Sequence, residues 1–275
     1  MSPPLKDVKL FRNVVWKHYR DQGRVFPWRQ TRDPYRILVS EIMLQQTQAD
    51  RVVPFFRTFV KKFPTVELLA QAPLASVIRL WSGLGYNRRA LYLKRAGEII
   101  VREYRGMIPK DASVLDTLPG VGPYTAAAVC AFAFNQPAVF IETNIRTVYI
   151  HHFFPRRKKV SDSVLLKLVK VTLDARRPAE WYQALMDYGA WIKKTVGNAN
   201  VHSVHYAKQK PFVGSRRQLR GRILRQVAEG SMTSKQACRL YSREHISLKL
   251  VQSAISQMVR EGLLRQANGR IFLPR

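Results

Sequence analysis

Two glutamates have surroundings that suit opposite roles in acid–base chemistry. Glu41 lies in an apolar helical pattern, four residues after Ile37 and three after Leu38, which places its carboxyl group on an apolar helix face. A carboxyl group there is tolerated only when it is paired or protonated. We therefore predict that Glu41 is either a general acid kept protonated by burial or a structural residue bonded to an arginine.

The second glutamate, Glu142, follows a short apolar run, Ala138–Ile141, that we expect to be buried. A carboxylate that emerges here could stay ionised and steady a developing positive charge. Two carboxyl groups in contrasting environments can act as acid and anion, as they do in the cleavage of glycosidic bonds.

A glycine turn precedes the most apolar helix expected in the chain. Gly120 and Gly122 flank Val121, Pro123 stands at the first helical position, and residues 125–134 are rich in alanine. Backbone N–H groups of such a turn and of the helix start point outward together and can bind phosphate. The alternative is a glycine-capped turn that only joins two helices.

A second glycine-containing loop carries an aromatic side chain followed by two cations. Tyr86 ends the stretch Gly83-Leu84-Gly85-Tyr86, and Arg88 and Arg89 begin the next expected helix. A tyrosine of this kind can enter a base stack while arginines hold phosphates. Alternatively, Tyr86 is an ordinary core aromatic.

Charge and composition indicate a polyanionic partner. The chain has 275 residues, with 47 Lys and Arg against 18 Asp and Glu and a net charge of +29, yet 46% of its residues are hydrophobic. Nucleic acid is the usual partner for such a chain, and a basic protein that meets acidic lipid is the alternative. We find neither a membrane-spanning apolar stretch nor a signal peptide, so we expect an intracellular, nucleoid-associated protein without a membrane partner.

The two cysteines limit the possible cofactors. Cys130 and Cys238 both lie in apolar helical patterns, where buried thiols are common. A four-cysteine zinc site or iron–sulfur cluster needs more ligands than this, so we predict no such cofactor.

Hydrophobic periodicity predicts an all-α fold with a small basic domain at its end. Helices are expected at 8–19, 35–46, 49–62, 64–72, 73–82, 87–104, 125–134, 145–154, 164–173 and 179–192. Residues 195–215 have the composition of a linker. We therefore predict a main helical domain over 1–194, a linker over 195–215 and a further domain over 216–275.

The last 60 residues have the element order of a winged helix. Helices are expected at 216–228, 233–241 and 248–261, and Asn268-Gly269 is a hairpin signal between two short apolar runs. Such a domain commonly places its third helix in the major groove. A small protein-contact domain is the alternative.

Several segments in one order carry a resemblance to a known family. They are FPWR (Phe26–Arg29), DPYRILVSEIMLQQTQ (Asp33–Gln48), LWSGLGYNRRA (Leu80–Ala90), LPGVGPYTAAAV (Leu118–Val129), ETNIRTV (Glu142–Val148) and MDYGAW (Met186–Trp191). Together they resemble the helix-hairpin-helix (HhH-GPD) DNA glycosylases, and among these the MutY adenine glycosylases, over roughly residues 8–192. The resemblance implies a two-lobed helical fold that binds double-stranded DNA as a monomer.

The resemblance also implies roles for individual residues. Glu41 would protonate the purine ring, Glu142 would stabilise the positive sugar, and Tyr124 and Arg29 would help to hold the extruded base. The residues expected to contact DNA are Gln45, Gln46, Thr47, Tyr86, Arg88, Arg89, Leu118, Gly120, Val121, Gly122 and Asn144. Of these, Gln46 and Tyr86 would enter the duplex. The carbonyl groups of Leu118 and Val121 could hold Na⁺ or K⁺, and we expect no other metal.

The implied reaction is hydrolysis of an N-glycosidic bond in base excision repair. The extruded base would be adenine from a mispair, and removal of mismatched thymine or uracil, or of a damaged base, is the nearest alternative. Relatives that also cut the strand carry lysine where Tyr124 stands, so we expect no Schiff-base lyase activity. A non-catalytic DNA-binding protein on the same scaffold is an alternative of another class.

This sequence departs from the family pattern at three places. Glu142 and Thr143 stand where the family has Asp and Gly, and the longer side chain displaces the carboxylate by roughly 1.5 Å. The four cysteines that many relatives place after the MDYGA segment are missing. The domain that recognises 8-oxoguanine in MutY is not evident, and the basic winged helix occupies its place.

Overall fold

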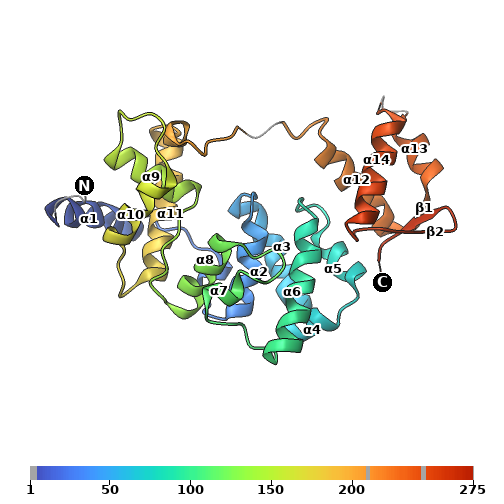
Figure 1. The fold of residues 1–275 in the computed structure, drawn as a ribbon, viewed down its shortest axis with the longest axis horizontal. Helices are drawn as coiled ribbons and strands as arrows, with labels where there is room; N and C mark the ends of the chain where they lie inside the picture. The colour runs from blue at the N-terminus through green and yellow to red at the C-terminus, as the bar shows by residue number, and fades with distance from the viewer. Residues whose placement is uncertain (1–4, 209–210, 243–245, 275) are drawn as a thin grey trace. The chain divides into compact units, whose positions relative to one another are not determined.

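The structure is a computed structural model that describes residues 5–208, 211–242 and 246–274, and these residues are mostly helical (Figure 1). The α-helices are α1 (Leu5–Gln22), α2 (Pro34–Leu44), α3 (Ala49–Lys62), α4 (Val66–Gln71), α5 (Leu74–Trp81), α6 (Arg88–Tyr104), α7 (Ala112–Leu115), α8 (Pro123–Phe134), α9 (Thr143–Phe153), α10 (Asp162–Thr172), α11 (Pro178–Thr195), α12 (Arg216–Glu229), α13 (Ser234–Ser242) and α14 (Leu248–Arg260). Two 3-10 turns are η1 (Pro27–Arg29) and η2 (Ala199–His202), and the strands are β1 (Met232–Thr233), β2 (Arg265–Ala267) and β3 (Arg270–Phe272). The predicted all-α class is confirmed.

The described residues form two compact units, and each is assembled from separate stretches of the chain. The first unit takes its described residues from within the ranges 1–38, 109–117 and 121–208, and the second from within 39–108, 118–120 and 209–275. Helix α2 and the glycine turn therefore each contribute residues to both units. The predicted domains follow sequence order, whereas the compact units do not, because linker composition cannot indicate where a segment packs.

The first unit is built around the packing of α11 against α9. Trp181, Tyr182 and Tyr149 are fully buried there, and the Phe140 ring stacks on Tyr182 with centroids 3.8 Å apart. Phe140 is the only fully buried residue of the run 138–141, and Val139 is 38% exposed, so the predicted burial of the whole run is wrong. The run has no regular secondary structure, and within it the Phe140 ring packs against Tyr182.

The predicted linker is partly packed structure. Within the residues described there, η2 buries Asn200, whose side-chain amide donates to the Thr143 carbonyl oxygen and the Thr147 hydroxyl. Val160 also forms a β-bridge with Ser203. Polar residues form this contact through hydrogen bonds, which hydrophobic periodicity does not detect. Residues 209–210 of the predicted linker lie outside the described residues.

In the second unit the C-terminal helices share a hydrophobic core with α5 and α6. Ile78 of α5 and Leu91 of α6 belong to the same buried cluster as Leu219, Ile223 and Val251. Strands β1, β3 and β2 form an antiparallel sheet in that order, with Ile271 of β3 opposite both Met232 and Gln266.

Local signals account for most element boundaries in the C-terminal segment. Asn268 and Gly269 both have positive φ, +48° and +70°, which confirms the predicted hairpin turn. Thr233, expected in the second helix, instead pairs with Arg270 in β1. A two-residue strand has no periodicity of its own, so the sequence pattern could not indicate it. The four-residue helix α7 was missed for the same reason.

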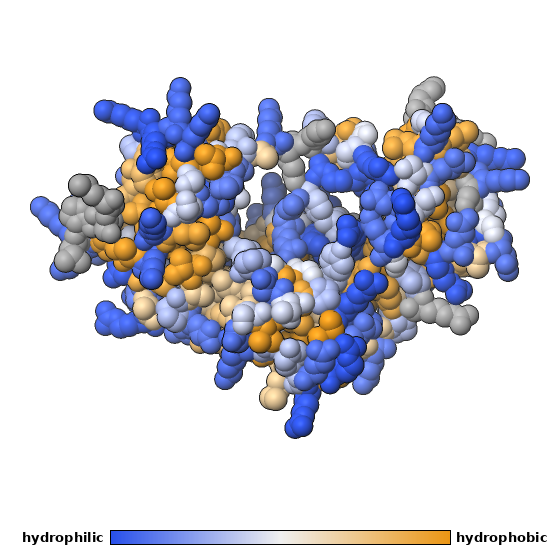
Figure 2. Space-filling model, viewed as in Figure 1, coloured by the Kyte–Doolittle hydropathy of each residue, from blue (hydrophilic) through white to orange (hydrophobic). Residues whose placement is uncertain are grey.

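Hydrophilic side chains cover much of the surface that Figure 2 displays, with hydrophobic residues visible between them. Among the described residues, no helix combines the length and the apolar character needed to cross a bilayer.

Candidate active site and nucleic-acid interface

Helix α2 positions the first predicted glutamate. Glu41 is only 4% exposed, and Ile37, Leu38 and Ile42 around it in sequence are 2% exposed or less. The predicted burial of the Glu41 carboxyl group is confirmed. Its role as an acid stays a prediction.

The end of α2 is held by a buried arginine. The Arg89 guanidinium group donates hydrogen bonds to the carbonyl oxygens of Ile42, Met43 and Gln45 at 2.9, 2.6 and 2.7 Å, and also to the Thr47 hydroxyl. The Ile42 and Met43 carbonyl groups belong to the last turn of α2, which leaves its carbonyl groups without intrahelical partners. Burial lowers the pKa of Arg89 to about 10, and the side chain is still charged at neutral pH.

This geometry corrects the expected phosphate contact of Arg89. The residue is 6% exposed and its N–H groups are directed at the backbone, so Arg89 shapes the loop that follows α2 and does not reach outward. Arg88 next to it has a side chain that is 52% exposed; it lies 4.0 Å from the Glu261 carboxylate and donates to the Tyr92 hydroxyl, so its contact with phosphate stays a prediction. Sequence alone could not distinguish two consecutive arginines at a helix start.

The loop after α2 and the glycine turn are joined by a side-chain hydrogen bond. Gln45 Nε2 donates to the carbonyl oxygen of Gly120 at 3.0 Å. Gln46 beside it has a positive φ of +54°, an uncommon backbone conformation that is often found at functional sites. The two segments predicted to contact DNA thus meet within the second unit.

Glycine suits the two positions of the turn, 120 and 122, for different physical reasons. Gly120 has a φ of +78°, and a Cβ there would lie 2.7 Å from the Tyr92 Cβ. Gly122 has an ordinary φ of −108° and open space around it, and it caps α8. The backbone conformation at Gly122 therefore does not require glycine, and the open space there suits close approach of a partner.

Tyr86 is a half-buried residue in a strained loop. Its φ is +48°, and its ring centroid lies 5.4 Å from the Arg89 guanidinium carbon and 5.5 Å from that of Arg217. Its hydroxyl accepts a hydrogen bond from Arg217. The alternative of a core aromatic does not fit this exposure. Arg217 belongs to α12, a contact that sequence reasoning missed because the two residues are 131 positions apart.

Glu142 is the N-cap of α9. One carboxylate oxygen accepts from the backbone N–H groups of Asn144 and Ile145 at 2.8 and 2.9 Å, and the other accepts from the Asn144 side-chain amide at 3.2 Å. These donors match an ionised carboxylate at the positive end of a helix dipole. Lys193 Nζ donates to Asn144 Oδ1 at 3.0 Å; burial lowers the pKa of Lys193, and the charge of Glu142 opposes that shift.

Arg29 binds the buried carboxylate of Asp187, a residue that the sequence analysis did not single out. Its two terminal nitrogens bind both oxygens of Asp187 at 2.8 and 2.9 Å, and Arg24 binds the same carboxylate. Burial opposes ionisation of Asp187, but the hydrogen bonds and charges of Arg29 and Arg24 hold its pKa below the usual value. The test applied to Glu41, a carboxyl group within an apolar helical segment, would also have found Asp187.

Tyr124 lies in the first turn of α8, where it is half-buried with its ring 5.5 Å from Phe140 in an edge-to-face contact. Glu41 belongs to the second unit and Glu142, Arg29 and Tyr124 to the first. Their convergence on one base stays a prediction.

A cavity of about 460 Å³ opens in the second unit beside Tyr86. The loop residues Gln45, Gln46 and Tyr86 line one part of it, and α12 and α14 line another.

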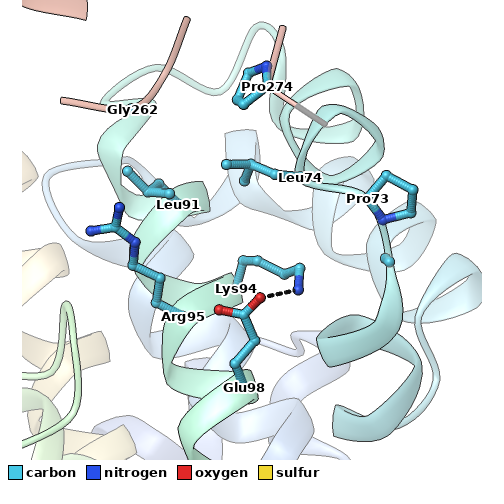
Figure 3. A pocket seen from close by; sticks show the side chains of 9 residues that line it. Pro73, Leu74, Leu91, Lys94, Arg95, Glu98, Gly262 and Pro274 are labelled. Atoms are coloured by element: carbon cyan, nitrogen blue, oxygen red, sulfur yellow. Dashed lines mark hydrogen bonds and ion pairs between the residues drawn. The ribbon is translucent and has the colours of Figure 1, made fainter. Parts of the chain in front are cut away.

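A second cavity, of about 340 Å³, lies between α6 and the C-terminal residues Gly262 and Pro274 (Figure 3). In Figure 3 the Lys94 ammonium group points to Glu98, and it also donates to the Ala70 carbonyl oxygen. In the part of the chain that the structure describes, no cluster of three or more His, Cys, Asp or Glu side chains could hold a metal ion.

The comparisons relate the chain to a class of DNA repair protein. Residues 39–172, just under half of the chain, match the HhH-GPD superfamily of base excision DNA repair proteins. This segment contains the predicted residues from Glu41 to Asn144.

Relatives with curated names are adenine DNA glycosylases. The protein of Buchnera aphidicola subsp. Baizongia pistaciae is 34% identical over 188 residues, which is 66% of this chain and 53% of that protein. The protein of Mycobacterium tuberculosis is 39% identical over 183 residues, or 65% of this chain and 60% of that protein. The chain thus spans between about half and three fifths of the length of these two relatives.

Solved structures have the same fold. A thermostable thymine-DNA glycosylase superposes with a TM-score of 0.60 at 28% identity, covering 67% of this chain and 87% of that one. Endonuclease III, trapped in a covalent complex with DNA, superposes with a TM-score of 0.54 at 19% identity, over 76% of this chain and 91% of that one. The second likeness concerns the fold alone.

Proposed function

We propose that this protein is a monofunctional DNA glycosylase that releases adenine from a mispair by hydrolysis of its N-glycosidic bond. The observation that carries the proposal is the Glu41 carboxyl group, buried on an apolar helix face inside the segment that matches the base excision repair superfamily. The similarity to curated relatives named adenine DNA glycosylases supports adenine as the base.

The reaction needs a base that has left the duplex, because its glycosidic bond is not accessible inside the stack. Glu41 donates a proton to the purine ring, the bond between the sugar carbon and the ring nitrogen breaks, and the bonding electrons leave with the neutral base. The sugar becomes a cation that water then attacks, and the proton lost by that water returns to a carboxylate. An ionised Glu142, held by the backbone N–H groups at the start of α9, stabilises this cation.

Two further residues, Arg29 and Tyr124, are proposed to position the groups that react. Arg29 fixes the loop after α1 to Asp187, and Tyr124 stands at the start of α8. Because Tyr124 has no amine, it cannot form a Schiff base with the sugar, and the product is an intact strand with an abasic site. The proposed partner is double-stranded DNA with a mispair, and the protein is proposed to act as a monomer. A monovalent cation is proposed to bind the Leu118 and Val121 carbonyl groups. No iron–sulfur cluster or other cofactor is proposed.

The test is single-turnover base release by Glu41→Gln on a duplex that contains one mispair. We expect the rate to fall at least a hundredfold, since an amide cannot donate a proton in this way, while duplex affinity stays within about threefold. The matched control is Glu103→Gln, because Glu103 is an exposed carboxylate on α6 that pairs with Arg102. An equally active Glu41→Gln protein would reject the proposal.

A second candidate substrate is thymine or uracil opposite guanine, which the likeness to a thermostable thymine-DNA glycosylase favours. A panel of duplexes, each with one adenine, thymine or uracil mispair and scored for alkali-labile breaks, separates the two. Release of pyrimidine and not of adenine would select the second candidate.

A further inference from the structure

We infer that Lys193 positions the carboxylate of Glu142 for the proposed reaction, and that it acts through the side-chain amide of Asn144. This inference rests on the proposed function and deepens it, because it assigns a positioning residue to the group that stabilises the sugar cation. The three residues belong to the first compact unit, so the argument depends on contacts within that unit alone.

The two carboxylate oxygens of Glu142 are held by donors of different kinds. Oε1 accepts from two backbone N–H groups at 2.8 and 2.9 Å, and these donors are fixed by α9 itself. Oε2 accepts from the side-chain amide of Asn144 at 3.2 Å. A side-chain amide can turn over and exchange its NH2 group for its carbonyl oxygen. The orientation of the Asn144 amide therefore determines whether Oε2 is held.

The ammonium group of Lys193 fixes the orientation of this amide. Lys193 Nζ donates to Asn144 Oδ1 at 3.0 Å, and an ammonium group has donors but no acceptor. The amide must therefore present its oxygen to Lys193 and its NH2 group to Glu142. A charged donor on the oxygen also polarises the amide, which strengthens the hydrogen bond at its other end. Without Lys193, a turned amide would place its oxygen against the carboxylate.

Helix α11 brings Lys193 to this point through its close approach to α9. Gly189 and Lys193 are four residues apart on α11 and therefore lie on one face of the helix. A Cβ at position 189 would lie 2.1 Å from the Asn144 carbonyl oxygen, so glycine is required for this approach. Asn200 of η2 also donates to the Thr143 carbonyl oxygen, which fixes the backbone next to Asn144.

The environment of Lys193 differs from that of the cations near it. Its side chain is half-buried, whereas Lys194 is exposed. Burial lowers the pKa of Lys193, the Glu142 charge opposes that shift, and the Arg146 charge adds to it. Arg146 itself binds both oxygens of Asp162 at 2.7 Å. Lys193 is therefore the cation that holds the Asn144 amide.

The test compares a cationic and a neutral mimic of the sugar in the same duplex. A pyrrolidine with a protonated ring nitrogen replaces the excised nucleotide in one probe, and tetrahydrofuran replaces it in the other. Fluorescence anisotropy gives the Kd of the full chain for each. We expect the unchanged chain to bind the pyrrolidine probe about tenfold more tightly or better. Lys193→Met should reduce this ratio to about threefold or less, and Glu142→Gln should do the same.

The direction of the change separates positioning from a simple effect of charge. Removing a positive charge would by itself favour a cationic probe, because repulsion between the two is lost. The positioning role predicts the opposite result for Lys193→Met, a weaker preference for pyrrolidine. Lys193→Arg keeps a charged donor and should retain most of the preference.

The matched control is Lys194→Met, which removes the same charge from the next, exposed position of α11 and should keep the ratio. Asn144→Leu removes the amide and should lower the ratio as much as Lys193→Met does. The double variant should lower it no further, because the two residues act as one unit. Circular dichroism and thermal unfolding establish that each variant is folded.

These measurements need no bond cleavage, so their outcomes separate the two proposals. A preference for pyrrolidine that needs Glu142 but survives in folded Lys193→Met would overturn this inference and keep the proposed reaction. A chain that shows the expected ratios but releases no base would keep the inference and reject the reaction. An unchanged chain that binds both probes alike would overturn the inference together with the role of Glu142.

Discussion

At the scale of single residues, the buried carboxylate of Asp187 forms ion pairs with Arg29 and Arg24 in the first unit. We predict that Asp187→Asn lowers the free energy of unfolding by about 3–5 kcal/mol, because it leaves Arg29 with an uncompensated charge in a buried position. Urea denaturation at pH 7 measures this. The control is Asp21→Asn, which removes an exposed partner of Lys17 and should change stability by less than about 1 kcal/mol.

The same carboxylate predicts a pH dependence. Because its pKa in the folded protein is lower than in the unfolded chain, its stabilisation is complete above the unfolded value of 3.8 and is lost as pH falls through the folded value. The stability difference between the wild type and Asp187→Asn should therefore be constant from pH 7 to pH 5 and shrink below about pH 4. A difference that grows with acid would contradict the assignment.

Two neighbouring arginines, Arg88 and Arg89, are expected to differ in their contribution to stability. Arg89→Met should destabilise the protein by about 3 kcal/mol, because several carbonyl oxygens at the end of α2 lose a charged donor. Arg88→Met should leave stability within about 1 kcal/mol, since its side chain is half exposed. Thermal unfolding measures both, and equal losses would contradict the distinction between a buried cap and a surface cation.

At the scale of elements, the glycine turn before α8 has one position expected to matter for folding, Gly120, and one expected to matter for binding, Gly122. Gly120→Ala should cost about 1–2 kcal/mol or more of stability, given its positive φ and the close Tyr92 side chain. Gly122→Ala should cost about 1 kcal/mol or less, because its backbone is ordinary and the space around it is open, and only the preference for glycine over alanine at an N-cap is lost. If the turn contacts DNA, Gly122→Ala should weaken duplex binding by more than its small loss of stability explains.

Helices and their order could be predicted from the sequence because apolar periodicity and turn residues are local signals. The burial of Glu41 followed from its place between Ile37 and Ile42, and the hairpin followed from Asn268-Gly269. What could not be predicted depends on contacts between distant residues. The bond from Arg217 to Tyr86 and the burial of Asn200 against Thr147 have no local signature.

At the scale of the whole molecule, the net charge of +29 should dominate the affinity for DNA. Neutralising about six phosphates would make Kd rise roughly a thousandfold between 50 and 200 mM salt. Titrations at several salt concentrations give the slope, and replacing one exposed phosphate-binding arginine should reduce it by about one. A flat response would count against a duplex as the partner.

The shared cluster of Ile78 and Leu91 with the C-terminal helices has a consequence for protein engineering. A shortened chain that stops near residue 194 would leave these two side chains facing water, so shortening alone is expected to favour aggregation. Exchanging the tail for another recognition module would require compatible replacements on α5 and α6. Relatives with an unrelated tail should accordingly carry different side chains at these two positions.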